Sequence, residues 1–214
     1  MRFLIADDHP IFRSGLKSLL LSYFPYSEIV EKNDGREAEK YILEHQPDYA
    51  ILDIDMPGKN GLEICLSANA ATTTKVIILT MYKDADMLRK AMDNGADAYL
   101  VKDNTSDELV ECIETLILGK KYWAKSLKSP EIQSELKEYR EVAGKLSLLT
   151  ETELKTLKLV GKKYSSKEIA ELLFVSVKSV ENYRSRICKK LELDAKNNSL
   201  LIWVLDNKSV LEEF

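Results

Sequence analysis

The chain has 214 residues, of which 45% are hydrophobic and 31% charged, as is ordinary for a soluble globular protein of one or two domains. It contains no apolar run near the roughly 18 residues that a membrane helix needs. It also begins directly with a strand-like run, so neither a membrane span nor a signal peptide is expected.

The net charge of −4 is unevenly spread along the chain. Residues 1–128 contain 16 Lys or Arg against 21 Asp or Glu, whereas residues 155–190 contain 10 against 3. This contrast predicts two parts with different tasks, the second of them on a polyanion. Three cysteines without metal-like spacing indicate reduced thiols in a cytoplasmic protein. They are Cys65, Cys112 and Cys188.

Strand-like and helical patterns alternate five times through residues 1–120. The strand-like runs cover residues 2–6, 27–31, 49–53, 75–79 and 97–101. The helical patterns cover residues 11–21, 35–44, 61–66, 84–94 and 105–118. Thr105 and Glu108 form a capping-box pattern that predicts the start of the last of these helices. Five β-α units predict a five-stranded parallel sheet with helices on both faces, a doubly wound, flavodoxin-like α/β fold.

Polar residues follow four of these strands at their carboxyl ends. They are Asp7, Asp8, Asp53, Thr80 and Lys102. Because open parallel sheets bind ligands at this edge, we expect these side chains to share one crevice. Three carboxylates repel one another unless a cation lies among them, and hard oxygen ligands with room for water suit Mg²⁺. A metal, a lysine and a hydroxyl around one carboxylate favour a phosphoryl group on it, so the sequence predicts an aspartyl phosphate at Asp53.

With these residues at these strand ends, residues 1–120 resemble the receiver domain of two-component response regulators. The resemblance implies that Asp53 is the phosphoacceptor and takes a phosphoryl group from a partner histidine kinase. It also implies a Mg²⁺ ion as cofactor. Its ligands would be Asp8, Asp53 and the backbone carbonyl of Asp55, with Asp7 assisting.

The same resemblance implies roles in switching. Lys102 would pair with the phosphoryl oxygens, Thr80 would move to hydrogen-bond one of them, and Tyr99 would follow inward. The added charge of about −1.5 to −2 makes such a switch a local electrostatic event with a distant consequence. Asp103 departs from the common pattern, because many receivers have proline there. Met81, beside Thr80, is bulky, and we expect it to shield the aspartyl phosphate from water.

An enzymatic interpretation starts from Asp53-Ile54-Asp55, because Asp-x-Asp also begins the nucleophile motif of haloacid-dehalogenase-type phosphatases. That motif stands near the start of the chain in those enzymes. Here it lies on the third strand and continues into Met56-Pro57. The order of elements therefore favours a regulator that is not an enzyme.

Residues 121–147 break the alternation and are expected to link two domains. From Pro130 to Gly144 the segment is highly charged, with one weak apolar stripe. It predicts a partly helical linker. We favour a solvated connector over the alternative, a helix that packs the two domains together in the resting state.

Residues 148–214 predict a small all-helical domain. Helices are expected at residues 150–160, 167–173, 177–191 and 197–206. Thr150 and Ser165 begin capping boxes, and Ser176 is placed to cap the third helix. The short turn at residues 174–176 fits a helix-turn-helix, whose third helix is free to enter a major groove. The apolar stripe expected to face inward on that helix consists of Val177, Val180, Ile187 and Leu191.

This region is similar to the LuxR-type helix-turn-helix. The residues that carry the resemblance are Leu149-Thr150, Glu153, Ser166 to Ala170, Leu173, Ser176, Ser179-Val180, Ile187 and Lys190-Leu191. Together with the receiver domain, residues 148–214 give the architecture of NarL/FixJ-type response regulators. Tyr183 stands where relatives usually have His, and Glu181 where many have Lys, which affects the target sequence rather than the fold.

By this resemblance, the outward face of the third helix would contact double-stranded DNA. The residues expected at base edges or adjacent phosphates are Lys178, Ser179, Asn182, Arg184 and Ser185. Those expected at the DNA backbone are Lys167, Arg186, Lys189 and Lys190. The final helix has more apolar surface than a lone cap needs, so we expect it to pair in a homodimer on a two-fold DNA site. These apolar residues are Leu200, Leu201, Trp203, Val204 and Leu205.

The two resemblances imply a cytoplasmic, DNA-binding transcriptional response regulator. Its expected partners are a sensor histidine kinase, which phosphorylates Asp53, and promoter DNA. Phosphorylation is expected to relieve inhibition and to promote dimerisation. A different class is a protein-binding regulator whose carboxyl-terminal domain no longer holds DNA, and the basic third helix argues against it.

Overall fold

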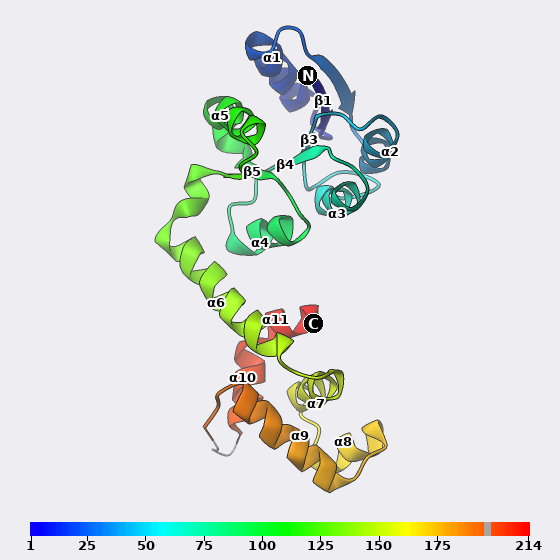
Figure 1. Cartoon of the computed structure of the whole chain (residues 1–214), viewed down its shortest axis with the longest axis vertical. Helices are drawn as coiled ribbons and strands as arrows, with labels where there is room; N and C mark the ends of the chain where they lie inside the picture. Colours follow the sequence, from blue (N-terminus) through cyan, green and yellow to red (C-terminus); the bar gives the residue numbers. More distant parts are fainter. Residues whose placement is uncertain (195–197) are drawn as a thin grey trace. The chain divides into compact units, whose positions relative to one another are not determined.

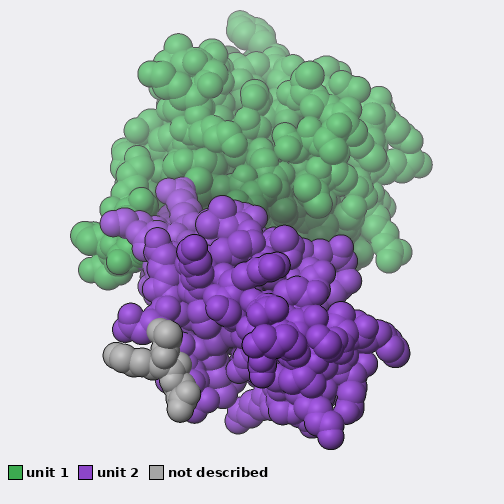
Figure 2. Space-filling model, turned by 60° about the horizontal axis from the view of Figure 1, so that its bottom comes forward, with its two compact units in different colours: residues 1–134 green, residues 135–214 purple. Residues whose placement is uncertain are grey.

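The computed structural model describes residues 1–194 and 198–214, which form two compact units (Figure 2). The first unit covers residues 1–134 and the second covers residues 135–214. Within the described residues, every helix is too short or too polar to span a membrane.

A parallel sheet of six strands forms the centre of the first unit, in the order β2-β1-β3-β4-β5-β6 (Figure 1). The strands are β1 (Arg2–Ala6), β2 (Glu28–Lys32), β3 (Tyr49–Leu52), β4 (Lys75–Thr80), β5 (Ala98–Val101) and β6 (Tyr122–Trp123). Apart from the first residues of β1 and β4, the strands β1, β3, β4 and β5 are buried along their whole length. Continuous apolar runs of this kind suit a parallel sheet that is covered on both faces.

Helices form a layer on each face of this sheet. They are α1 (Pro10–Tyr23), α2 (Gly35–His45), α3 (Gly61–Ala71), α4 (Ala85–Asp93) and α5 (Thr105–Ile117). α1 packs beside α5, and α3 packs between α2 and α4 (Figure 1). The doubly wound α/β fold expected from the sequence is confirmed.

The prediction of five strands was wrong by one, because β6 lies in the segment expected to link the domains. It pairs in parallel with β5, with Ala98 opposite Tyr122 and Tyr99 opposite Trp123. A strand of two residues is too short to leave a recognisable apolar pattern in the sequence.

The capping box expected at Thr105 and Glu108 was also wrong. A 3₁₀ turn, η1 (Lys102–Asn104), leads directly into α5, and its first carbonyl accepts a hydrogen bond from the Thr105 hydroxyl at 3.0 Å. Glu108 is buried and accepts from the Tyr122 hydroxyl at 3.2 Å and from the backbone N–H of Lys125 at 3.1 Å. This acid therefore fastens the segment that follows α5 to the helix, rather than capping it.

The expected linker is largely helical. It continues from β6 through the 3₁₀ helix η2 (Lys125–Lys128) into α6 (Pro130–Ser147). Near the end of α6, Leu146 is buried in the core of the second unit. The Tyr139 hydroxyl donates to the Glu213 carboxylate at 2.9 Å. The latter part of this segment is thus packed within the second unit and is not a solvated connector.

Helices alone form the described part of the second unit. After α6 these are α7 (Glu151–Gly161), α8 (Ser166–Leu173), α9 (Val177–Lys190), α10 (Ser199–Asp206) and α11 (Lys208–Glu213). The first three predicted helices are confirmed, and the fourth is confirmed as α10, although its expected start at Asn197 lies outside the described residues. α11 was not expected.

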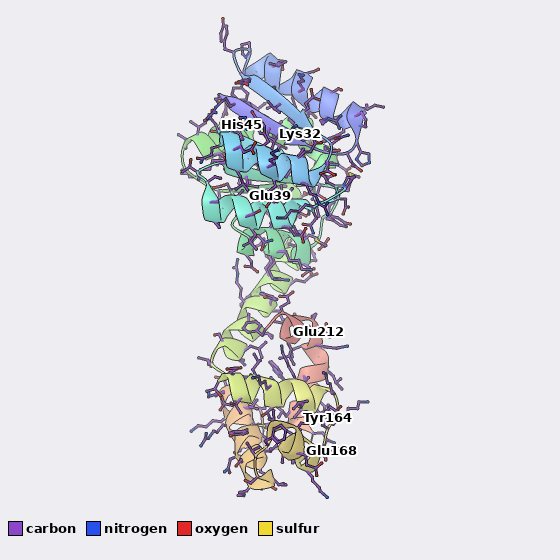
Figure 3. All side chains as sticks on the ribbon, turned by 90° about the vertical axis from the view of Figure 1, so that its right-hand side faces the viewer. Lys32, Glu39, His45, Tyr164, Glu168 and Glu212 are labelled. Atoms are coloured by element: carbon purple, nitrogen blue, oxygen red, sulfur yellow. The ribbon has the colours of Figure 1, made fainter. Side chains whose placement is uncertain are left out.

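The predicted capping residues begin three of these helices. Capping boxes are complete at Thr150 with Glu153 and at Ser165 with Glu168, which Figure 3 labels on α8. Ser176 accepts from the backbone N–H of Ser179 at 3.0 Å and so begins α9.

Three of the four apolar residues expected to face inward on α9 are in the core of the second unit. They are Val180, Ile187 and Leu191. Val177 was assigned wrongly, because it lies in the first turn of α9 and is 42% exposed. The core thus holds α9 along one stripe and leaves its opposite face in solvent.

Candidate functional site

The carboxyl ends of β1, β3, β4 and β5 place the predicted polar residues along one edge of the sheet. Asp7 and Asp53 directly follow β1 and β3, and the backbone N–H of Asp53 donates to the Ala6 carbonyl at 2.9 Å. Thr80 is the last residue of β4, which lies between the strands that lead to Asp53 and Lys102. The strand ends that carry these residues therefore lie side by side at one edge of the sheet.

Lys102 joins two of the acids directly. Its Nζ lies 2.6 Å from Asp53 Oδ2 and 2.8 Å from Asp7 Oδ2. All three side chains are less than one-tenth exposed, so their charges interact with little screening by water. Charged groups buried this deeply require compensation, and one ammonium compensates two carboxylates only in part.

The ionisation of the site reflects burial first and the neighbouring charges second. Burial raises the pKa of Asp53, the hydrogen bond and charge of Lys102 oppose that shift, and the charge of Asp7 adds to it, so the pKa ends above its ordinary value. Burial by itself would lower the pKa of Lys102, but hydrogen bonds to Asp53 and Asp7 raise it above its ordinary value. The lysine is therefore held as a cation, while burial keeps the pKa of Asp53 raised despite the lysine beside it.

Four possible metal ligands gather at this edge. One ligand atom from each of Asp7, Asp8, His9 and Asp53 lies within 4.8 Å of all the others. The carboxylate oxygens are the hard donors that Mg²⁺ prefers, and Asp8 is open to solvent, which leaves room for the water that Mg²⁺ retains. The residues thus fit the cation implied by the sequence, although His9 was not among those predicted. The sequence feature that could have identified His9 is its position directly after two aspartates.

A tight turn after β3 shapes the approach to Asp53. A Cβ on Gly61 would lie 2.2 Å from the Asp53 carbonyl oxygen, so a side chain there would force the two segments apart. Gly61 instead donates its backbone N–H to the Ile54 carbonyl at 3.0 Å. Asp55, whose carbonyl was expected to bind the metal, lies in this turn and is exposed.

Thr80 and Tyr99 are connected through the backbone of Tyr82. The Tyr82 N–H approaches Thr80 Oγ1 at 3.4 Å, and the Tyr82 carbonyl accepts from the Tyr99 hydroxyl at 3.0 Å. The Tyr99 ring is fully buried, and this burial raises the pKa of its hydroxyl well above its ordinary value. The carbonyl of the same residue accepts from the Ala124 N–H at 2.9 Å, at the end of β6.

An open hollow borders the site. It is lined by His9, Ile11, Phe12, Met81, Lys102 and Asp103. Met81 is 62% exposed here, so its side chain is placed at the rim rather than in the core. The Lys102 Nζ lies 4.9 Å from the centre of the Phe12 ring.

The second unit presents most of the predicted DNA-contacting residues to solvent. The exposed ones are Lys167, Lys178, Asn182, Ser185, Arg186 and Lys189. The half-buried ones are Ser179, Arg184 and Lys190. Ser179 takes part in the N-terminal cap of α9, and Lys178 forms an ion pair with Glu181 at 3.2 Å.

The Lys190 side chain forms an ion pair with a buried acid of the second unit. Its Nζ lies 2.6 Å from the buried carboxylate of Glu153 and 3.0 Å from the Leu148 carbonyl. Burial would raise the pKa of Glu153, but the hydrogen bonds from Lys190 and Thr150 lower it overall. The ammonium of Lys190 is therefore used in contacts within the second unit and is less available to a ligand.

Comparisons with known proteins agree with this division into two parts. Residues 3–114 match the response regulator receiver domain, and residues 147–202 match the bacterial regulatory proteins of the luxR family. The oxygen regulatory protein NreC of Staphylococcus epidermidis is 37% identical over 205 residues, which cover 92% of this chain and 93% of that protein. NreC of Staphylococcus carnosus is 36% identical over 204 residues, with the same coverage.

Solved structures of response regulators also match this chain. A DNA-binding response regulator of the LuxR family from Staphylococcus aureus is 35% identical, with a TM-score of 0.51, and the match covers 54% of this chain and 97% of that one. The Salmonella typhimurium RcsB response regulator has a TM-score of 0.55 over 96% of this chain and 98% of its own, and at 24% identity it supports the fold alone. The two matched families describe a DNA-binding transcription regulator and not an enzyme, which removes the phosphatase interpretation. The chain belongs to the response regulators that join a receiver domain to a LuxR-type helix-turn-helix.

Proposed function

We propose that this response regulator takes a phosphoryl group from a partner histidine kinase on Asp53 and thereby controls its binding to promoter DNA. The observation that carries the proposal is the buried contact of 2.6 Å between Asp53 and Lys102. A carboxylate at the carboxyl edge of a parallel sheet, with a buried ammonium beside it, suits a nucleophile whose phosphorylated form needs an adjacent cation. The regulator would act in the cytoplasm.

In the proposed transfer, a carboxylate oxygen of Asp53 attacks the phosphorus of the phosphorylated kinase histidine. The new P–O bond forms while the P–N bond breaks, and the imidazole of the kinase keeps the electron pair. Lys102 would then pair with a phosphoryl oxygen instead of the free carboxylate, and it would remain close to Asp7. This exchange keeps the ammonium compensated throughout.

Mg²⁺ would be held by Asp8, Asp53 and the backbone carbonyl of Asp55, with Asp7 assisting. When bound, it supplies positive charge that offsets the phosphoryl oxygens. Two buried carboxylates, Asp7 and Asp53, share one ammonium, and this arrangement supports such an ion because a divalent cation would offset the remaining negative charge. Met81 at the rim of the hollow would limit access of water to the phosphoryl group.

Phosphorylation would be transmitted through Thr80 and Tyr99. If the Thr80 hydroxyl turns to donate to a phosphoryl oxygen, it changes its contact with the Tyr82 N–H, and the same peptide segment carries the acceptor for the Tyr99 hydroxyl. A displacement of Tyr99 then affects β5, which is bonded to β6. Since β6 leads into η2 and α6, the segment between the two units is coupled to the site.

DNA would bind along the exposed face of α9. Asn182 and Ser185, with Lys178, Ser179 and Arg184, are assigned to base edges or adjacent phosphates. Lys167, Arg186 and Lys189 are assigned to the backbone. Lys190 was also expected at the backbone, and its contact with buried Glu153 makes it the weakest of these candidates.

Dimerisation through α10 would fit a two-fold site. Leu200 and Val204 are buried in the core of the second unit, so they are not available to a partner copy. Ile202 and Leu205 are 56% and 49% exposed and would form the contact instead. RcsB, a relative in fold, has been solved as dimers bound to DNA.

The test is to treat the purified full chain with acetyl phosphate and Mg²⁺, and to locate the modification by mass spectrometry. Label at residue 53, absent in Asp53→Asn, is the expected result, and no label would overturn the proposal. Selection of genomic fragments with and without acetyl phosphate tests the output. A phosphorylated chain that retains no DNA would instead favour the protein-binding regulator.

A further inference from the structure

His9 occupies the N-cap position of a helix without capping it. It is the N-cap residue of α1, directly before Pro10, yet its side chain caps no backbone N–H of the helix. Ser, Thr, Asp or Asn at an N-cap typically stabilises a helix by about 1 kcal/mol, and histidine is not among these residues. The imidazole is also 68% exposed and contributes no packing to the core.

The imidazole is instead directed at the acids of the site. His9 Nδ1 lies 2.7 Å from Asp8 Oδ1 and 3.2 Å from Asp7 Oδ1. The backbone N–H of His9 already donates to the same Asp7 oxygen at 2.7 Å, so Asp7 does not need the ring for its orientation. Neighbouring ligands at right angles on an octahedral ion with bonds of about 2.1 Å are about 3 Å apart, which the two ring distances bracket.

We propose that His9 is a further ligand of the divalent cation at the phosphoacceptor site and raises the affinity of this site for first-row transition metals relative to its affinity for Mg²⁺. The proposal rests on the cation site of the proposed function. Carboxylate oxygens accept Mg²⁺ and Mn²⁺ alike, whereas an imidazole nitrogen favours the first-row transition ions. The ring is exposed, so it can turn onto an ion without rearrangement of the core. The ligand class is therefore a divalent ion that tolerates one nitrogen among oxygens, such as Mn²⁺ or Co²⁺.

The chain provides its own control, because it contains two histidines. His45, labelled in Figure 3, lies at the end of α2 and stacks on Tyr41 with ring centres 4.4 Å apart. Its carbonyl accepts from the side chain of Arg2, the first residue of β1, so it lies toward the sheet edge opposite to Asp7. His45→Gln therefore removes an imidazole without touching the cation site.

The experiment is isothermal titration calorimetry of the full chain with Mg²⁺ and with Co²⁺. The proteins compared are the original chain, His9→Gln and His45→Gln. All three carry Cys188→Ser, which removes the partly exposed thiol as a competing metal ligand. We expect His9→Gln to weaken Co²⁺ binding about tenfold or more, because even the loss of an outer-shell partner of a metal ligand costs about tenfold to a hundredfold. Mg²⁺ binding should change by less than about twofold, because Mg²⁺ prefers oxygen ligands. His45→Gln should change neither. An unchanged ratio of the two affinities in His9→Gln would overturn the proposal.

A second measurement observes the bond directly. Electron spin echo modulation of bound Mn²⁺ detects a coordinated ¹⁴N, which should be present in the original chain and in His45→Gln, and absent in His9→Gln. If Mn²⁺ binds without any nitrogen signal, and if this binding is lost in Asp53→Asn, the assignment of His9 is refuted. The cation site of the proposed function would then remain supported. Mn²⁺ and Mg²⁺ that fail to bind at all would sink both.

Discussion

Replacement of Lys102 tests the electrostatics of the site most directly. Its ammonium lies 2.6 Å from Asp53 and 2.8 Å from Asp7, and all three side chains are less than one-tenth exposed. Lys102→Met keeps the aliphatic stem but leaves two buried carboxylates without their cation. We expect the free energy of unfolding of the first unit to fall by about 3–5 kcal/mol, the usual result when one partner of a buried ion pair is removed.

Urea unfolding can measure this change in the first unit by itself. The chain has two tryptophans, so the fluorescence of Trp123 reports on the first unit when both proteins also carry Trp203→Phe. Adding Asp53→Asn to Lys102→Met should recover a large part of the loss, because it removes one of the two uncompensated charges. Mg²⁺ at about ten times its dissociation constant should return about 1.4 kcal/mol.

The pH dependence gives an independent check with a defined sign. Since the folded pKa of Asp53 is already raised, its ionised form destabilises the fold at neutral pH, and this effect disappears as pH falls through that raised pKa. Removal of Lys102 removes an influence that lowers the pKa of Asp53. The difference in stability between Lys102→Met and the original chain should therefore be largest at neutral pH and should shrink on acidification. A loss below about 1 kcal/mol, unaffected by pH or Mg²⁺, would refute this reasoning.

Three further predictions address the other parts of the chain. Lys190→Ala should destabilise the second unit by about 3 kcal/mol in urea unfolding, because it leaves the buried carboxylate of Glu153 without its cation. Lys189→Ala should leave the stability unchanged. It should instead weaken binding to all DNA sequences and flatten the dependence of binding on salt by about one unit of slope. Met81→Ala should speed the loss of phosphate from the acetyl-phosphate-treated chain, and an unchanged half-life would remove its shielding role. Ala124→Pro should leave labelling of residue 53 intact but reduce the gain in DNA binding on phosphorylation, because it deletes the N–H that bonds to β5. The φ of −47° at this position lies close to the range that proline requires.

The sequence was sufficient for those features that rest on local chemistry. The strand ends that carry Asp7, Asp53, Thr80 and Lys102 were predictable because buried parallel strands leave long apolar runs, and parallel strands place their carboxyl ends together. The capping boxes of α7 and α8 were predictable because the Ser or Thr and the Glu three positions later satisfy each other within one turn.

The failures came from partners that are distant in sequence. Glu108 has the spacing of a capping box, but its carboxylate bonds to Tyr122 and Lys125, which β6 brings over α5. Lys190 has the position of a phosphate contact, but α7 supplies it with the buried acid of Glu153, 37 residues away. In both cases the local pattern fits two roles, and tertiary packing selects the one that leaves no buried carboxylate without a partner.

The connection between the site and α6 depends on the sixth strand. With only five strands, the segment after α5 would leave the first unit without a backbone bond to the sheet. With β6 in place, hydrogen bonds run from the end of β4 through Tyr82 to the Tyr99 hydroxyl, and from the Tyr99 carbonyl to Ala124. One residue, Tyr99, thus takes part in both contacts, one through its side chain and the other through its backbone. Since Glu108 independently bonds the same segment to α5, we expect a shift of β5 relative to α5 to change the position of residues 122–125, which lead into α6.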